Sequence, residues 1–524
     1  MYIEPNSNIK IYHNVPLDNT YNHTLYFSSL SEQNTYFHSN QNIIKYNLTA
    51  QSYQRVVKGS MRVSVKADNL YDCNYLAFQN ASFGTKWFYA FITGVEYVNN
   101  ETSEITFEID VMQTYFFDVT LKSCFVEREH STTDNIGDNI QAEPVSLGEY
   151  INSDYGLVGT VTDMLVLIMI ADETSTSYGD LYDGIYGGCD IWAYNSYDTT
   201  NITQKIQSYI QKPDQIIALY MCPKILIPNV TEGGKHLSFS ATASFSTFTL
   251  NSVTEETQDF GGYVPKNKKL YTYPYNFLRI DNCSGQSLNL RYEFFDNLTP
   301  VIEIRGTFLM PVKLVARPCS YKGLPQHTEL GGYTSSKSEC ITLENYPMCS
   351  WNVDTFKAWL AQNSVPIALN SIAGVTNAAI ASHSSPRGKA SAVKSIIGDV
   401  ADTLSNAYTS SIAADQCRGN VSNGNVNVSN GTQAFYKTRC HITKDYAEVV
   451  DNFFTMYGYA TKKVKIPNIS ARPHWNYVKT IGCVLSGNAP ADDVRKICEI
   501  YDNGITFWKS ASEVGDYSLD NSPS

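Results

Sequence analysis

Several segments within the first 130 residues of the chain alternate between apolar and polar positions with a period of two. Within residues 105–111, Ile105, Phe107, Ile109 and Val111 fall on one face. This period is typical of half-buried strands. Asn99-Asn100 divides two such runs and predicts a hairpin turn. The first 130 residues are therefore predicted to be β-structured.

The middle of the chain carries several further strand patterns. Met164 to Ala171 is continuously apolar and too short to span a bilayer, so it is predicted to be a buried central strand. Residues 236–316 contain short strand patterns separated by turns, which is typical of sandwiches and barrels. Tyr178 to Tyr197 is rich in Tyr, Gly and Asp and is predicted to form exposed loops. Thr203 to Ile210 is predicted to be a short helix.

The last 90 residues combine helical and strand patterns. Asp445 to Tyr457 and Asp492 to Asn503 have helical patterns, and a glycine follows each of them. Glycine is the preferred residue just beyond a helix C-terminus. Ile505 to Trp508 reads as a strand. The chain as a whole is predicted to be mainly β.

Residues 351–432 differ from the rest of the chain. Val365 to Ser382 contains no charged side chain, and a polar tip, His383 to Lys389, separates it from a second apolar arm. Eighteen residues only just reach across a hydrocarbon core of about 30 Å. The small residues also suit a helical hairpin packed inside the protein. An Asn/Gly/Ser-rich stretch, Gly419 to Gly431, follows and reads as a flexible linker or an extended loop.

Composition narrows the classes of function. Charged residues make up 17% of the 524 residues, below the usual ~25%, whereas there are 37 tyrosines. A surface poor in charge and rich in Tyr suits a permanent assembly. The formal net charge of −12, without a basic run, argues against binding of a specific nucleic-acid sequence, but not against a channel through which DNA slides.

Neither a metal, a cofactor nor an enzymatic activity is expected from the motifs. The 12 cysteines include no CxxC pair, which favours reduced, buried thiols. The sequence contains no GxSxG, HExxH, P-loop or strand-linked GxGxxG motif. Glu127 and Glu129 lack an identifiable acid/base partner, and the neighbouring Cys440 and His441 would point to opposite faces of a strand. The N-terminus lacks a signal-peptide pattern, so no signal peptide is expected.

Short motifs near both chain ends resemble the tail knob proteins of small short-tailed bacteriophages with protein-primed replication. They occur in the family's order and at roughly its spacing, over about the first 130 and the last 80 residues. In the N-terminal part they are Phe78 to Ala81, Gly84, Lys86 to Phe91, Phe107 to Val111, Gln113-Thr114, Phe117-Asp118 and Arg128 to His130. In the C-terminal part they are Phe453-Phe454, Tyr457 to Tyr459, Pro467-Asn468, Trp475 to Tyr477, Lys479-Thr480, Cys483, Asp502 to Thr506, Trp508 and Gly515 to Ser518. The middle matches poorly apart from Tyr273 to Tyr275.

The resemblance implies a non-enzymatic virion protein at the distal end of a phage tail, made in the host cytoplasm without a signal peptide. It implies that both chain ends combine into a β-barrel or β-sandwich tube module, and that six copies close a ring around the DNA channel. The expected partners are other copies, the collar- or connector-side tail protein, viral DNA passing through the lumen, and the host cytoplasmic membrane. The resulting domain prediction is residues 1–130 and 433–524 for the tube module, 131–350 for an inserted knob, and 351–432 for an apolar loop and linker.

The apolar loop is implied to plug the lumen and later to perturb the host membrane. It is shorter and richer in Ala and Ser than the family pattern. The residues expected to act on the membrane are Val365, Ile367, Leu369, Ile372, Val375, Ile380, Val393, Ile396, Ile397 and Leu404.

Two other functions remain open from the sequence. The Tyr- and Gly-rich loops between about 172 and 200 would suit a passive adhesin that binds a cell-wall glycan, since Tyr suits sugar contacts. Glycan binding by the middle region would distinguish this hypothesis. A capsid or other scaffold protein is the third possibility, and ring-forming self-association would count against it.

Overall fold

The computed structural model describes most of the chain outside residues 352–416. The described residues are 7–51, 59–80, 84–159, 161, 163–171, 181–182, 185–186, 189–209, 215–237, 241–253, 259–322, 339–344, 346, 348–351, 417–420 and 433–523. They form two units. Unit 1 contains Met1–Gly148, Asp259–Leu270 and Thr443–Ser524, and unit 2 contains Glu149–Gln258 and Tyr271–Ile442. The chain thus returns briefly to unit 1 at Asp259–Leu270, which the sequence patterns did not predict.

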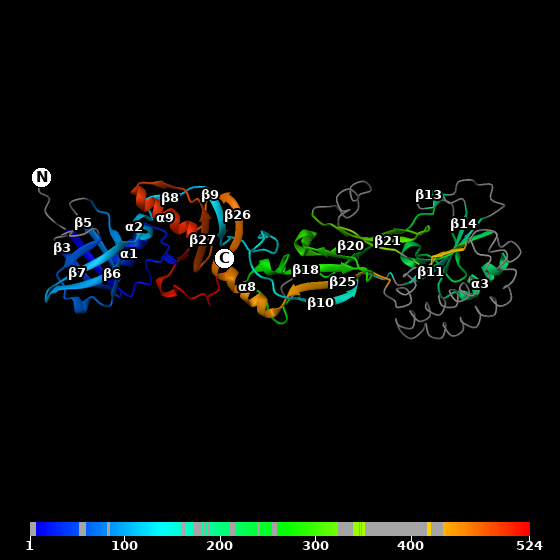
Figure 1. Cartoon of the computed structure of the whole chain (residues 1–524), viewed down its shortest axis with the longest axis horizontal. Coiled ribbons are helices and arrows are strands. Elements are labelled where there is room, and N and C mark those ends of the chain that lie inside the picture. Colours follow the sequence, from blue (N-terminus) through cyan, green and yellow to red (C-terminus); the bar gives the residue numbers. More distant parts are fainter. Residues whose placement is uncertain are drawn as a thin grey trace. The chain divides into compact units, whose positions relative to one another are not determined.

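The first sheet of unit 1 comes entirely from the N-terminal segment. Its six strands lie in the order β3-β1-β5-β6-β7-β4. Four of them, β3, β5, β6 and β7, are labelled in Figure 1. Their bounds are β1 Ser7–His13, β3 Ile44–Gln51, β4 Ser60–Val63, β5 Cys73–Asn80, β6 Phe88–Asn99 and β7 Thr102–Ile109. Ile105 and Phe107 are buried, as their period-two pattern predicted. Val111, however, begins helix α2 (Val111–Tyr115), because the Asp110 side chain accepts a hydrogen bond from the Gln113 N–H and caps the helix there.

The second sheet of unit 1 combines both ends of the chain. Its strand order is β2-β29-β27-β9-β26, antiparallel except for the parallel pair β2 and β29. The N-terminal segment contributes β2 His23–Leu25 and β9 Cys124–Glu129, and the C-terminal segment contributes β26 Tyr459–Lys465, β27 Trp475–Ile481 and β29 Ile505–Trp508. A two-stranded sheet joins β8 Val119–Leu121 to β28 Leu485–Gly487. A sheet of this kind cannot form until residues more than 300 positions apart meet.

The helices of unit 1 complete its core. They are α1 Leu30–Ser39, α2, α8 Lys444–Tyr457 and α9 Ala491–Asn503. One apolar cluster contains side chains of both chain ends, including the fully buried Phe37, Tyr75, Trp475 and Trp508. Gly458 ends α8 at φ +65°, and a β-carbon there would lie 2.3 Å from the Glu129 carbonyl oxygen. Only glycine fits this helix end, as its place in the sequence predicted.

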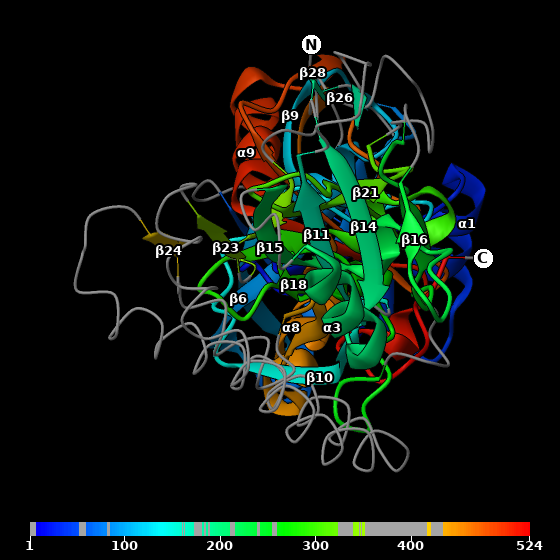
Figure 2. The same cartoon turned by 90° about the vertical axis from the view of Figure 1, so that its right-hand side faces the viewer.

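Unit 2 is also mainly β. Its largest sheet has the order β16-β14-β11-β15-β23-β24 (Figure 2). These strands are β11 Met164–Ile170, β14 Asp190–Asn195, β15 Ile216–Pro223, β16 Lys235–His236, β23 Met348–Trp351 and β24 Cys417–Asn420. The predicted central strand is confirmed as β11. The prediction of exposed loops over Tyr178 to Tyr197 is wrong for β14, where Ile191, Ala193 and Tyr194 are buried because they pair with β11.

The rest of the described part of unit 2 includes three smaller sheets, an α-helix and short 3-10 helices. The four-stranded sheet β10-β25-β18-β19 contains β10 Tyr150–Leu157, β18 Asn276–Asp281, β19 Ser287–Leu290 and β25 Tyr436–Ile442. The sheet β17-β20-β21-β22 contains β17 Ser246–Thr249, β20 Val301–Thr307, β21 Lys313–Cys319 and β22 Ile341–Leu343. A short hairpin joins β12 Leu181–Tyr182 to β13 Ile185–Tyr186, and the predicted short helix is α3 Thr199–Ser208.

The mainly β fold class predicted from the sequence is confirmed. The assignment of residue ranges to a tube module, a knob and a loop stays a prediction. Among the described residues, no helix is both long enough and apolar enough to cross a membrane.

Candidate functional site

The predicted membrane-active residues lie outside the described part of the chain. All of them, from Val365 to Leu404, fall within residues 352–416. The described residues instead contain a buried polar cluster in unit 1. It joins α8, the segment Asp259–Leu270, the loop after β9 and the C-terminal residues. We call this cluster the polar joint.

Asp451 of α8 is the centre of the polar joint. Its side chain is 1% exposed. The carboxylate accepts hydrogen bonds from the backbone N–H groups of Lys266 (2.7 Å) and Asn267 (3.0 Å), from the Asn267 side-chain amide (2.8 Å) and from the Tyr263 hydroxyl (2.5 Å). Buried carboxylates require such partners because an unpaired charge is costly in the protein interior. Asp451 therefore fixes the path of the returning segment against α8.

A second carboxylate, Glu143, binds the other end of the same segment. It forms ion pairs with Lys269 and Arg128, and it accepts a hydrogen bond from the Ala460 N–H of β26 at 2.8 Å. The side chains of Glu143, Lys269 and Arg128 are 1%, 2% and 9% exposed. Burial lowers the pKa of Lys269, and the Glu143 carboxylate opposes that effect. Arg128 also donates to the Gly458 carbonyl oxygen at 2.6 Å.

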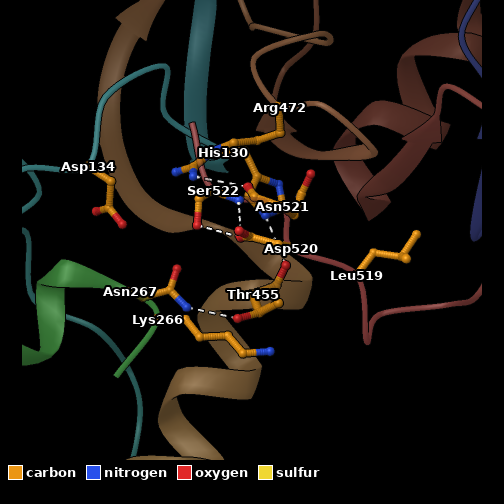
Figure 3. Close-up of a pocket in the computed structure, with 10 residues that line it drawn as sticks. All are labelled: His130, Asp134, Lys266, Asn267, Thr455, Arg472, Leu519, Asp520, Asn521 and Ser522. Atoms are coloured by element: carbon orange, nitrogen blue, oxygen red, sulfur yellow. Dashed lines mark hydrogen bonds between the residues drawn. The ribbon is translucent and has the colours of Figure 1, made fainter. Parts of the chain in front are cut away.

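Asp134 extends the polar joint toward a small cavity of about 20 Å³ (Figure 3). Its carboxylate lies 2.7 Å from the Tyr459 hydroxyl and accepts a bond from the Lys268 N–H at 3.2 Å. Burial raises the pKa of Asp134, whereas the bond from Tyr459 opposes the shift. The volume is enough for one water molecule and too small for an organic substrate.

The C-terminal residues close the other side of this cavity. The Asn521 side chain accepts bonds from the N–H groups of His474 (3.1 Å) and Trp475 (3.3 Å) and donates to the Trp475 carbonyl oxygen (2.9 Å). The Arg472 guanidinium donates to the Asn521 carbonyl oxygen at 3.3 Å. Asn521 thus continues the hydrogen bonding of β27 and holds the chain end against the sheet.

His130 lines the same cavity and is 3% exposed. Its Nδ1 accepts a bond from the Tyr477 N–H at 2.8 Å, so the other nitrogen, Nε2, carries the proton and donates to the Thr455 carbonyl oxygen at 3.1 Å. Burial, together with the nearby Arg472, lowers the pKa of His130 to about 3. His130 is thus held neutral, with both ring nitrogens used in structural bonds.

Replacing His130 with Gln is expected to make stability less dependent on pH. The folded-state pKa of His130 lies below its unfolded value of about 6.5, so stability is lost as pH falls below 6.5 toward 3; by pH 5 this loss is about 2 kcal/mol. The measurement is denaturant unfolding at pH 7 and pH 5. His236→Gln is the control, because the His236 side chain is 45% exposed. An equal pH dependence in the unaltered chain and His130→Gln would contradict the assignment.

The other residues considered for chemistry have structural partners. Glu127 pairs with Lys479 at 2.9 Å, and Glu129 pairs with Lys465 and accepts a bond from the Asn468 N–H. In the described parts of the chain, no group of His, Cys, Asp or Glu residues has the arrangement of a metal site. Glu127 and Glu129 thus take part in contacts within unit 1.

The sequence patterns did not predict the polar joint. Asp451 lies on the buried face of α8, together with the apolar residues Ala447, Val450 and Phe454. A charged residue among these apolar positions was the one sign in the sequence that Asp451 is buried. Its partners lie about 185 positions away in the sequence, so their identity could not be read from spacing.

Comparison with known proteins identifies the family of this chain. The family model described as Bacillus phage phi29, tail knob protein gp9, C-terminal domain, matches residues 239–522, which is just over half of the chain. The chain belongs to the tail knob protein gp9 family. A second model, the caudoviral major tail protein N-terminus, matches residues 5–120. The resemblance seen in the sequence motifs is confirmed.

Relatives of this tail knob protein match along nearly its whole length. It is 26% identical to tail knob protein gp9 of Bacillus phage PZA over 591 aligned residues, and 26% identical to that of Bacillus phage phi29 over 589, with 98% of both chains covered in each case. The solved structure of the bacteriophage C1 tail knob protein, gp12, has a TM-score of 0.62 and 15% identity, and the match covers 98% of this chain and 99% of the other. The C1 likeness shows a common fold. The chain is therefore a structural component of a phage tail.

Proposed function

We propose that this tail knob protein forms the distal conduit through which viral DNA leaves the tail. Copies of the chain close into a ring, with six expected from the family resemblance. The ring joins the collar- or connector-side tail protein at one end, and DNA passes through its lumen without sequence-specific binding. The observation that carries the proposal is the match of the tail knob family model over residues 239–522. The net charge of −12 supports it, because an acidic wall does not hold phosphates.

We further propose that residues 351–432 first plug this lumen and then perturb the host cytoplasmic membrane. The support is the sequence of Val365 to Ser382, which lacks charge and is rich in small apolar residues. In the stored state the apolar arms bury one another. Removal of the contacts that hold the plug would expose them, so the mechanism is displacement and not catalysis.

Replacing residues 365–414 with a short Gly/Ser linker is expected to abolish dye leakage from anionic liposomes caused by the full chain. Apolar side chains that partition into the bilayer are the cause of leakage, and the linker has none. A matched pair of variants localises the effect. Changing Ile372 and Ile396 to Asp should strongly reduce leakage, whereas changing Ala373 and Ala378 to Ser should leave most of it.

The leakage assay is run at neutral and mildly acidic pH, and assembly is followed by light scattering. Leakage that persists after the linker replacement would contradict the membrane role of the loop. If the unaltered chain forms rings but causes no leakage, the loop would act only as a plug and the conduit role would stand. Glycan binding by the assembled chain, with no leakage, would favour the adhesin hypothesis.

A further inference from the structure

Three cysteine thiols meet at one end of the second sheet of unit 1. Cys124 begins β9, Cys483 follows the end of β27, and Cys498 lies in α9, three elements that are labelled close together in Figure 1. Cys124 is more than 300 positions away from the other two in the sequence, so no spacing pattern predicts their meeting. Cys483 and Cys498 are partly exposed, whereas Cys124 is buried. We call these three residues the thiol cluster.

The backbone at Gly482 directs the Cys483 side chain into the thiol cluster. Neighbouring side chains of a strand alternate between its two faces, and Ile481, the last residue of β27, is exposed. Continued alternation would place Cys483 on the same outer face. Gly482 instead has a φ of +67°, in the left-handed region that glycine adopts without strain. The turn breaks the alternation, and Cys483 packs against the apolar cluster that both chain ends form.

Helix α9 brings Cys498 to the same place. Its Asp502 accepts hydrogen bonds from the N–H of Cys483 at 3.1 Å and from the Thr480 hydroxyl at 2.7 Å. Residues four positions apart lie on the same side of a helix, so Cys498 lies one turn away from the carboxylate that holds Cys483. The Cys483 thiol is in hydrogen-bonding contact with the Cys498 thiol and also with that of Cys124.

The two partly exposed thiols differ in how readily they react. Thiol–disulfide exchange begins with a thiolate that a small disulfide can reach. Burial raises the pKa of Cys498, but the hydrogen bond with Cys483 opposes this shift. Burial, together with the two neighbouring thiols, raises the pKa of Cys483 well above its ordinary value. Cys498 is therefore the thiol that reacts first with an oxidant, and Cys483 is the one beside it that can complete a bond.

We propose that Cys483 and Cys498 form a disulfide bond once the protein has left the reducing cytoplasm, and that Cys124 remains a thiol. The bond ties the turn after β27 to α9, and it joins two sulfur atoms that already lie side by side. A bacterial cytoplasm keeps thiols reduced, whereas the surroundings of a released virus particle are oxidising. The bond thus belongs to the finished tail. The inference depends neither on the conduit nor on a ring.

The oxidant is a small disulfide such as oxidised glutathione. The Cys498 thiolate attacks one sulfur atom of the oxidant, forms a mixed disulfide and releases one glutathione thiolate. The Cys483 thiol then loses its proton and attacks the Cys498 sulfur, which releases the second glutathione thiolate. Two protein thiols are thereby oxidised by two electrons, one disulfide is reduced, and the two protons end on the two glutathione thiols.

The test oxidises the folded full chain with glutathione disulfide at mildly alkaline pH, which favours thiolates. The product is digested without reduction and its peptides are mapped by mass spectrometry. The map should contain a linked pair of peptides that carries Cys483 and Cys498, and dithiothreitol should remove it. No such pair after oxidation of the folded chain would overturn the proposal, as would a link from Cys124 to either of the other two thiols. This measurement needs no substitution.

Stability gives a second readout of the same bond. A disulfide across this short loop is expected to lower the unfolding equilibrium constant of unit 1 about 100-fold, because it restricts the unfolded chain. Denaturant unfolding before and after oxidation measures the gain. Cys498→Ser should gain nothing, whereas Cys124→Ser, the matched control from the same cluster, should gain as much as the unaltered chain. An equal gain in both variants, or a gain absent from Cys124→Ser, would contradict the pairing of Cys483 with Cys498.

Discussion

Replacing Asp451 with Ala is expected to destabilise unit 1 by roughly 3–5 kcal/mol. The substitution leaves buried donors of Tyr263, Lys266 and Asn267 without their acceptor. Hydrogen bonds to a charged group contribute more than neutral ones, and a donor left unsatisfied in the interior loses its full solvation. The segment Asp259–Leu270 should consequently separate from α8 well before the rest of the unit unfolds.

Hydrogen exchange followed by mass spectrometry measures this effect locally. Peptides covering Asp259–Leu270 and α8 should exchange faster in Asp451→Ala, while peptides of the first sheet change little. Asn452→Ala is the matched control, because Asn452 is the next residue of α8 and is exposed. Equal exchange in Asp451→Ala and in the control would show that the hydrogen bonds of Asp451 do not hold this segment.

Replacing Glu143 with Ala is expected to lower the stability of unit 1 by a similar amount, about 3–5 kcal/mol. Its partners Lys269 and Arg128 would remain buried as positive charges without a counter-charge. Adding Lys269→Met to this variant should recover part of the loss, since the methionine removes one of the two stranded charges and fills a similar volume. Thermal melting of the single and double variants measures both effects.

The pH dependence of the Glu143→Ala variant offers an independent check. Burial already lowers the pKa of Lys269 in the folded protein, and without Glu143 this pKa falls further below its unfolded value. Above neutral pH the deficit should therefore shrink as pH rises and Lys269 loses its proton. Asp492→Ala is the control, because the pair of Asp492 with Arg495 is exposed and contributes little. If the variant with both Glu143→Ala and Lys269→Met is no more stable than Glu143→Ala, the uncompensated charge of Lys269 is not the cause of the loss.

Local patterns of the sequence determined the elements of this protein. The alternation around Ile105 and Phe107 predicted β7, and the continuous apolar run from Met164 predicted the central strand β11. Gly458 and Gly504 marked the ends of α8 and α9. Ordered motifs at the two chain ends also indicated the tail knob family. These features depend on one segment at a time, and hydrophobic periodicity reports which face of a segment is buried.

Only the tertiary structure decided which segments meet. Strand β9 lies between β26 and β27, and Arg128 reaches the Gly458 carbonyl 330 positions away. Periodicity says that a face is buried but not by what. For the same reason Tyr178 to Tyr197 looked like loops, although pairing with β11 buries β14.

The polar residues show this difference most clearly. Asp, Glu and His usually lie at the surface of a protein, but Asp451, Glu143 and His130 are buried here. Hydrogen-bond donors and counter-charges from distant segments of the chain make this burial possible. Val464 and Ile481 show the converse, since apolar residues of a strand remain exposed where the folded unit has nothing to cover them. The sequence by itself determined the elements, the fold class and the family. The meeting of both chain ends, the polar joint and the exposure of these apolar residues depended on long-range packing, which no local pattern encodes.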